Sequence, residues 1–191
     1  IVLTGYMPLT LYRHITGAGT YVFRRNITLL YHRHISFIDV LLGRAFLELV
    51  GTTGALVAVY LVLWLTGLVS PMQDPSLVIG AWFLMALLSF GLMTVFAVLT
   101  EYSEVTERFI QPYQYLQLPI SGTFFMVEWL PKRGQDLILY NPSVHVYEMF
   151  RAGFFGEATI THYTPWYPLL WGLALTWIGL SSIARIRDNI H

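Results

Sequence analysis

Two long runs of apolar and uncharged residues dominate the hydropathy pattern of the chain. Residues Leu49–Val69 and Pro75–Thr100 contain no charged side chain. A helix needs about 20 residues to cross the ~30 Å hydrocarbon core of a bilayer, and both runs reach that length. Only a short segment with one proline and the single acid Asp74 separates them. The pattern therefore predicts a helical membrane hairpin.

Three further stretches have the character of weaker membrane spans. Polar and helix-breaking residues interrupt Ile1–Val22, so this stretch is either one helix lined with polar groups or the end of a longer helix. Phe109–Val127 and Tyr163–Ala184 carry no charge. Between the spans we expect a polar connector over Arg24–Arg44 and a short acidic turn over Glu101–Arg108.

The segment Glu128–His162 is too long for a turn and too apolar for a free loop. Its apolar stretches Gln135–Tyr140 and Ser143–Phe155 are separated by the turn signal Asn141-Pro142. Neither is long enough to span a bilayer, so we expect a helical hairpin that enters the outer leaflet and is sheltered by protein or by a water-filled cavity. The predicted fold class is all-α: one polytopic bundle over residues 1–191, with five membrane helices and a re-entrant hairpin before the last.

The distribution of Lys and Arg predicts the orientation of this bundle, because short cytoplasmic loops are enriched in these residues. One side holds seven of them: Arg24, Arg25, Arg33, Arg44, Arg108, Arg185 and Arg187. The opposite side holds three: Lys132, Arg133 and Arg151. We therefore expect the 24–44 connector and the C-terminus to be cytoplasmic.

Composition supports a membrane protein and excludes several other classes. Charged residues make up 12% of the chain, against about 25% in soluble domains. The formal net charge of +0 argues against a nucleic-acid partner, which needs a basic face. The absence of cysteine from the sequence excludes disulfides and thiolate metal sites. Because the chain begins with Ile1 inside an apolar segment, we expect a fragment that lacks its true N-terminus.

Polar residues in the first span share one helical face. Tyr6, Thr10, Arg13 and Gly17 follow one another at helical spacing. An arginine at membrane depth costs at least about 2.5–3.5 kcal/mol on insertion scales, so it should face a cavity or a partner. These residues either line a conduit, or the helix ends near Tyr12 and Arg13 lies at the membrane interface.

The fourth span carries a second candidate face. Tyr113 and Phe124 are eleven residues apart, with Gln117 between them at an offset of four. Aromatic rings pack against sugar rings, and amides bond to sugar hydroxyls. We therefore expect these residues to line a passage for a neutral or weakly charged glycan, although many aromatic residues in membrane proteins simply face lipid or the protein core.

Two clusters of titratable residues are weaker candidates. The run Tyr31-His32-Arg33-His34 with Asp39 matches no strong metal-ligand spacing, so a solvated connector is expected there. His145, Glu148 and His162 form a second cluster that lacks the tighter spacing of a zinc hydrolase. We predict no catalytic residue and no metal site. The sequence has no glycine-rich phosphate loop, so we do not expect this chain to bind ATP by itself.

A series of short motifs runs along nearly the whole chain in a fixed order. They are Thr4-Gly5-Tyr6-Met7-Pro8, Leu30-Tyr31-His32-Arg33, Glu101-Tyr102-Ser103-Glu104 with Glu107-Arg108, Leu118-Pro119-Ile120-Ser121-Gly122, Trp129-Leu130-Pro131, and Tyr140-Asn141-Pro142 with His145, Glu148 and Arg151-Ala152-Gly153. Together they resemble the membrane subunit of type-2 ABC exporters. The resemblance is strongest to the capsular-polysaccharide and O-antigen export permeases of Gram-negative bacteria.

The resemblance implies a function, partners and site residues. Such permeases have six membrane helices, lie in the inner membrane, and form homodimers in which each copy pairs with a separate subunit that binds ATP and Mg²⁺. An interface helix and a first membrane helix precede the part that resembles residues 1–22. The expected cargo is a lipid-linked polysaccharide. The residues expected to line the translocation path are Tyr6, Thr10, Arg13, Tyr113, Gln117 and Phe124. Those expected to couple to the ATPase are Tyr31, His32, Arg33, His34, Asp39, Glu101, Glu104, Glu107 and Arg108.

Three alternatives remain open from the sequence. The same scaffold could export a small drug or a lipid. The cluster His145, Glu148 and His162 could belong to an enzyme that acts on lipid at the outer surface. The chain could also be a purely structural bundle, which would not co-purify with an ATPase.

Overall fold

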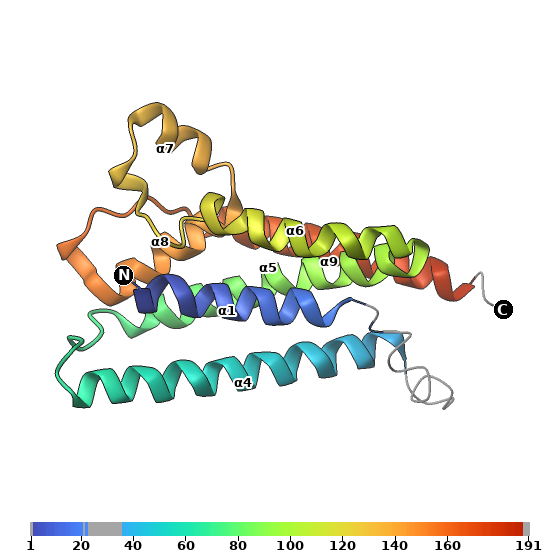
Figure 1. The fold of residues 1–191 in the computed structure, drawn as a ribbon, viewed down its shortest axis with the longest axis horizontal. Helices are drawn as coiled ribbons and strands as arrows, with labels where there is room; N and C mark the ends of the chain where they lie inside the picture. Colours follow the sequence, from blue (N-terminus) through green and yellow to red (C-terminus); the bar gives the residue numbers. More distant parts are fainter. Residues whose placement is uncertain (1, 21, 23–35, 189–191) are drawn as a thin grey trace.

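The computed structural model describes residues 2–20, 22 and 36–188, and within this part every regular element is a helix (Figure 1). The α-helices are α1 (Val2–Ala18), α4 (Phe37–Leu65), α5 (Pro75–Tyr102), α6 (Glu104–Ile120), α7 (Lys132–Ile138), α8 (Pro142–Phe155) and α9 (Trp166–Asp188). Two short 3₁₀ helices, η1 (Val127–Trp129) and η2 (Gly156–Ala158), flank α7 and α8.

The long helices lie side by side along one direction, and the short helices α7 and α8 gather at one end (Figure 1). The end of α1, the start of α4, the α5–α6 junction and the end of α9 all lie at the opposite end. The start of α4, the 101–108 region and the end of the C-terminal helix thus lie at the same end of the bundle. Which side of the membrane this end faces stays a prediction.

Three helices of the described chain are long and apolar enough to cross a membrane: α4, α5 and α9. Helices α1 and α6 have 17 residues each and carry more polar groups. The prediction of a membrane hairpin over Leu49–Val69 and Pro75–Thr100 thus agrees with the two most apolar helices of the structure.

Helix α4 begins earlier than the sequence pattern suggested. Ser36 caps its start: the Ile38 amide donates to Ser36 Oγ at 3.2 Å, and the Ser36 amide donates to Asp39 Oδ2 at 2.8 Å. This reciprocal capping box satisfies two amides that the first turn would otherwise leave open. The residues from Phe37 to Arg44 therefore belong to a helix, so the prediction of a connector reaching Arg44 is wrong.

The predicted acidic turn over Glu101–Arg108 is also wrong. Helix α5 continues to Tyr102, and Ser103 alone, with extended backbone, separates it from α6. The Ser103 amide still donates to the Leu99 carbonyl at 3.1 Å, while its own carbonyl accepts from the Thr106 amide at 3.1 Å. One residue is enough for the chain to change direction because both helices use its backbone groups.

Helix α6 ends seven residues before the predicted end of its span at Val127, since its last residue is Ile120. Ser121 caps the end, and Gly122 follows with a φ of +80°. That left-handed conformation favours glycine and turns the chain out of the helix. Phe124 therefore lies beyond the helix, and the prediction that it shares a helical face with Tyr113 and Gln117 is wrong.

The segment after α6 contains two short helices separated at Asn141-Pro142, close to the predicted division. Asn141 Oδ1 accepts from the Ser143 amide at 3.1 Å, and Pro142 occupies the first turn of α8. Every residue of α8 from Ser143 to Phe154 is buried, whereas α7 has no buried residue. Helix α8 is therefore enclosed by protein, packed mainly against α5 and α9.

Helices α5 and α9 form the closest pair of the bundle, and glycines allow the contact. A Cβ on Gly91 of α5 would lie 2.8 Å from Leu175 Cβ and 2.9 Å from the Gly172 carbonyl oxygen. Gly179 of α9 abuts Thr94 in the same way. By contrast, Gly51 and Gly54 of α4 have the small-xxx-small spacing of a helix-packing motif with Ala55 and Ala58. Neither glycine has a neighbouring atom within 4 Å of such a Cβ.

Candidate functional site

A groove of about 370 Å³ lies between α1 and α6. Its lining includes Tyr6, Thr10, Arg13 and Gly17, so the four positions that share a face of α1 by spacing open into one space. Leu9, His14, Gln111 and Gln114 complete the lining. The two helices run in opposite directions, because Gly5 abuts Thr123 whereas Gly17 lies near Gln114.

Arg13 is held over an aromatic ring in this groove. The carbon of its guanidinium lies 5.1 Å from the centroid of the Tyr115 ring on α6. A cation over a ring face gains about 0.5–1 kcal/mol at exposed sites and more where water is excluded. Next to it, His14 Nδ1 lies 3.0 Å from Glu48 Oε2 of α4, so the Glu48 carboxylate pairs with His14.

The glutamines of α6 divide between two sides of the helix. Gln114 is buried and donates from Nε2 to Thr16 Oγ1 of α1 at 2.9 Å. Gln117 instead donates to the Tyr113 hydroxyl at 3.0 Å, and its Oε1 accepts from Asn141 Nδ2 at 3.2 Å. The Tyr113 ring packs edge-to-face on Phe96 of α5, with 5.7 Å between centroids. Tyr113 and Gln117 thus lie in packed protein, away from the groove.

The structure therefore separates the residues predicted for the path. Tyr6, Thr10 and Arg13 share the groove, Tyr113 and Gln117 face α5 and α8, and Phe124 lies 60% exposed in the turn after α6. The sequence argument did not select Gln111, Gln114 and Tyr115, which lie around the groove. Their spacing of three and four residues was the available signal, since it places them on one side of a helix.

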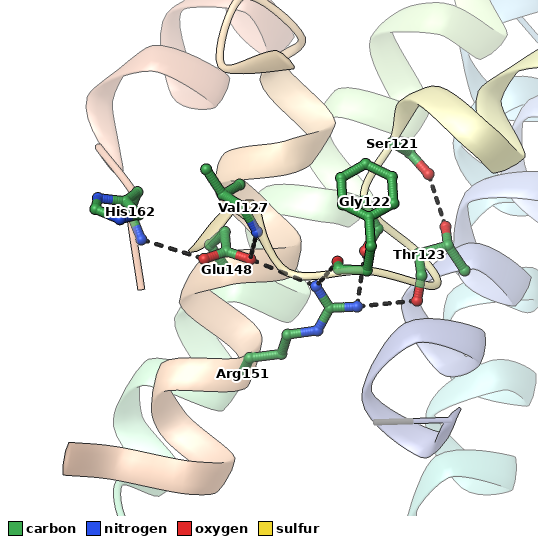
Figure 2. Close-up of polar contacts among 8 residues, drawn as sticks. Ser121, Gly122, Thr123, Val127, Glu148, Arg151 and His162 are labelled. Atoms are coloured by element: carbon green, nitrogen blue, oxygen red, sulfur yellow. Dashed lines mark hydrogen bonds and ion pairs between the residues drawn. The ribbon is translucent and has the colours of Figure 1, made fainter. Parts of the chain in front are cut away.

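The most enclosed polar site is an ion pair on α8 (Figure 2). Arg151 and Glu148 have side-chain exposures of 0% and 1%, and 3.4 Å separates Arg151 Nη1 from Glu148 Oε1. Arg151 also donates to three backbone carbonyls of the turn after α6: to Phe125 at 2.6 Å, to Gly122 at 2.7 Å and to Thr123 at 2.9 Å. Burial lowers the pKa of Arg151, and the neighbouring Glu148 carboxylate opposes that shift.

Glu148 connects two other segments to the same helix. Its Oε1 accepts from the Val127 amide at 3.3 Å, and its Oε2 accepts from the His162 amide at 3.2 Å. A buried charge is tolerated only when such partners compensate for lost hydration. The pair therefore fastens the turn after α6 and the segment before α9 to α8, and it is a structural site.

His145 has no free ring nitrogen for catalysis. Its Nδ1 accepts from the Thr164 amide at 3.0 Å, so Nε2 carries the proton and donates to the Leu139 carbonyl at 2.9 Å. Burial lowers the pKa of His145 and favours this neutral form. The His162 ring pairs with Glu128 at 2.8 Å, away from His145. The cluster proposed for a lipid-modifying enzyme is thus used for folding contacts.

The residues predicted to couple to an ATPase lie at one end of the bundle as far as they are described. Asp39 caps α4, Glu101 and Glu107 are partly buried near the α5–α6 junction, and Arg108 is exposed. Glu104 is the first residue of α6. Tyr31, His32, Arg33 and His34 fall outside the described residues. Among the residues that the structure describes, no three histidine or acidic side chains are grouped to hold a metal ion.

Comparison with known proteins gives related export proteins along almost the whole chain. It is 34% identical over 189 residues to the capsule polysaccharide export inner-membrane protein CtrC of Neisseria meningitidis, covering 99% of this chain and 71% of CtrC. It is 31% identical over 190 residues to BexB, a protein of the same description from Haemophilus influenzae, covering 100% and 72%.

A more distant relative is the polysialic acid transport protein KpsM of Escherichia coli, 26% identical over 196 residues that cover 98% of this chain and 72% of KpsM. No family model matches the chain. The matches to CtrC and BexB cover 99% and 100% of the chain, so they include the helices described above and both sides of the groove between α1 and α6. The chain therefore belongs to the capsule polysaccharide export family of inner-membrane proteins, the permeases of type-2 ABC exporters.

Proposed function

We propose that this chain is the membrane-spanning permease subunit of an ATP-driven exporter that moves a lipid-linked surface polysaccharide across the bacterial inner membrane. The observation that carries this proposal is the match over 99% of the chain to a protein named for capsule polysaccharide export. The groove between α1 and α6 supports it, because hydroxyl, amide and aromatic side chains line it between two helices of the bundle.

The α1–α6 groove is the proposed path in this conformation, with Tyr6, Thr10 and Arg13 contacting the cargo. The Thr10 and Gln111 side chains can form hydrogen bonds with sugar hydroxyls, and the exposed face of Tyr6 can pack against a sugar ring. Tyr113, Gln117 and Phe124 remain predictions for the path, since they lie outside this groove in the single copy. In the homodimer that we propose, a second copy would complete the passage.

The bundle spans the membrane five times in this proposal, with α1 and α6 crossing beside α4, α5 and α9. The polar residues of α1 and α6 suit helices that line a wet passage, where such residues are tolerated. Helices α7 and α8 form the re-entrant pair at the outer end. The enclosure of α8 by protein supports this placement, because backbone groups at membrane depth need such shelter.

The cytoplasmic end is the end that contains the α5–α6 junction, and the ATP-binding partner subunit docks there. The excess of Lys and Arg in the segments near this end supports the orientation. Asp39, Glu101, Glu107 and Arg108 are the described candidates for this contact, together with the predicted Glu104. Tyr31, His32, Arg33 and His34 are expected to extend it. ATP hydrolysis would then occur in the partner.

Deleting the gene in its native host tests the export function. We expect surface polysaccharide to be lost and to accumulate inside the cell, and re-expression of the complete permease should restore surface staining. Co-purification should recover an ATPase, and Arg108→Glu should weaken that recovery, with exposed Arg133→Glu at the other end as the matched control. Unchanged surface glycan after deletion would contradict the proposal, and loss of a drug or lipid export activity instead would favour the alternative cargo.

A further inference from the structure

The groove between α1 and α6 contains a cation, Arg13, that pairs with no acidic side chain in the part of the chain that the structure describes. Among the described residues that line it, Arg13 and His14 are the basic side chains, and none is acidic. His14 is bonded to Glu48. Among the described residues, no carboxylate forms an ion pair with Arg13, whose recorded side-chain contact is the Tyr115 ring.

Within the described residues, the Arg13 guanidinium contacts the Tyr115 ring and donates no hydrogen bond. A ring face provides no acceptor oxygen for the guanidinium, whereas its planar fork of N–H donors matches a carboxylate or a phosphate with two parallel hydrogen bonds. Contact with Tyr115 also reduces the freedom of the long side chain, so less conformational entropy is lost when a ligand binds. The site is therefore built for a planar or tetrahedral anion.

The surroundings of Arg13 fit an anionic sugar better than an isolated ion. Thr10 precedes it by nearly one helical turn, and Gln111 and Gln114 lie across the groove on α6. A volume of about 370 Å³ lies at the lower end of the ~300–1,000 Å³ range of small-molecule sites. It therefore suits a short segment of a glycan, with its acidic group at Arg13 and its hydroxyls at Thr10 and the exposed Gln111.

We propose that Arg13, stacked on Tyr115, binds an acidic group of the exported glycan, a carboxylate or a phosphate, as it passes through the groove between α1 and α6. This inference rests on the proposed export function and deepens it. It replaces the sequence-based expectation of a neutral or weakly charged cargo, because a charged residue without a counter-ion is costly in a membrane protein unless its ligand supplies the opposite charge.

Ligand binding to the complete permease, purified with its ATPase and reconstituted in nanodiscs, tests this inference without depending on transport. The probes are a short oligogalacturonate, its methyl ester of equal length as the neutral control, and inorganic pyrophosphate. We expect the acidic oligosaccharide to bind about tenfold more tightly than the ester, a ratio equivalent to about 1.4 kcal/mol. Added salt should reduce this difference, since it screens the charge.

Two substitutions and a matched control assign the effect to Arg13. Arg13→Gln should abolish the preference for the acidic probe, and Arg13→Lys should retain part of it, since charge remains without the planar fork. The exposed control Arg133→Gln on α7 should behave like the wild type. If Arg13→Gln does not fold, as judged by gel filtration, the affinities of Arg13→Lys for the two oligosaccharides still test whether Arg13 binds the acidic group.

The probes also distinguish the two sources of the acidic group. Tighter binding of oligogalacturonate identifies a carboxylate of the sugar chain, and tighter binding of pyrophosphate identifies a phosphate of the polymer or of its lipid carrier. Equal affinity for all three probes, or an undiminished preference in Arg13→Gln, would overturn the inference. Surface-glycan staining after gene deletion is a separate measurement, so the export function could stand while this inference failed.

Discussion

Helices α4 and α5 are similar in length and hydropathy, yet they differ in how much of their surface the protein covers. They have 29 and 28 residues, and their most apolar windows have mean hydropathies of 2.0 and 2.3. In the structure 11% of the α4 window is buried, against 56% of the α5 window. Figure 1 shows α4 along one side of the bundle and α5 among the other helices.

Hydropathy therefore identifies a membrane helix but does not show whether lipid or protein surrounds it. Lipid tails are as apolar as leucine, so an apolar face gains little by exchanging lipid for protein. Close packing then depends on small residues that lie opposite a neighbouring helix at the same level along its axis. Gly91 of α5 meets α9 in this way, whereas the glycines of α4 face open space.

The largest loss of stability is expected when the buried ion pair of α8, which packs against α5, is broken. Arg151→Leu would leave the buried Glu148 carboxylate without its counter-charge and three carbonyls without a donor, so it should cost about 3–5 kcal/mol of unfolding free energy. The measurement is unfolding by denaturant in detergent micelles. The exposed Arg133→Leu on α7 serves as control and should change stability by less than about 0.5 kcal/mol.

The second test adds the same side chain to a glycine of each helix. Gly91→Leu should force α5 and α9 apart and cost about 1–3 kcal/mol, as overpacking does. Gly54→Leu in α4 should have almost no effect, because a Cβ there meets nothing within 4 Å. Thermal unfolding and gel filtration of both variants compare them directly, and equal losses would invalidate the contrast between the two helices.

The third test concerns a direct bond between α4 and α5. Trp82 Nε1 donates to Thr53 Oγ1 at 2.9 Å. Trp82→Phe removes this bond, and we expect a loss of about 0.6 kcal/mol, the average for hydrogen bonds between membrane helices. The control is Trp177→Phe, the same substitution at an exposed position of α9. A loss above about 2 kcal/mol would mean that α4 is fixed to the bundle more firmly than its low burial indicates.

The smallest change in stability is expected from lowering the pH, which protonates His145 beside the buried core. Its pKa is lowered in the folded protein by burial, so the unfolded chain binds more protons as pH falls below about 6.5. The stability contributed by neutral His145 is complete above that pH and decreases as pH falls through the folded value.

Hydrogen exchange at the Thr164 amide measures this directly, because protonated Nδ1 can no longer accept its bond. Lowering the pH from 8 to 5 slows the intrinsic exchange of every amide, but the Thr164 amide should slow less than this intrinsic change requires, because it loses its acceptor. Amides in the middle of α4 should follow the intrinsic change. His145→Gln should remove the deviation at Thr164. Persistence of that deviation in the variant would refute the assignment.

Much of the candidate site was visible in the sequence because it depends on helical spacing alone. Tyr6, Thr10 and Arg13 lie on one face of α1 and line one groove. The face of α6 was predicted less well. Tyr113 and Gln117 were preferred over Gln111, Gln114 and Tyr115, since spacing shows which residues share a face but not which face meets the groove.

Local chemistry along the chain determined the apolar spans, the polar face of α1 and the helix boundary at Asn141-Pro142, because each depends on neighbours within a few residues. Tertiary structure decided which apolar helix is central and brought Arg13 into contact with Tyr115. It also placed Arg151 where its guanidinium donates to the carbonyls of a turn 26 to 29 residues earlier. Those outcomes depend on contacts between distant segments. In a membrane, hydrophobicity drives helices into the bilayer but not toward particular partners, so close packing and polar bonds make that choice.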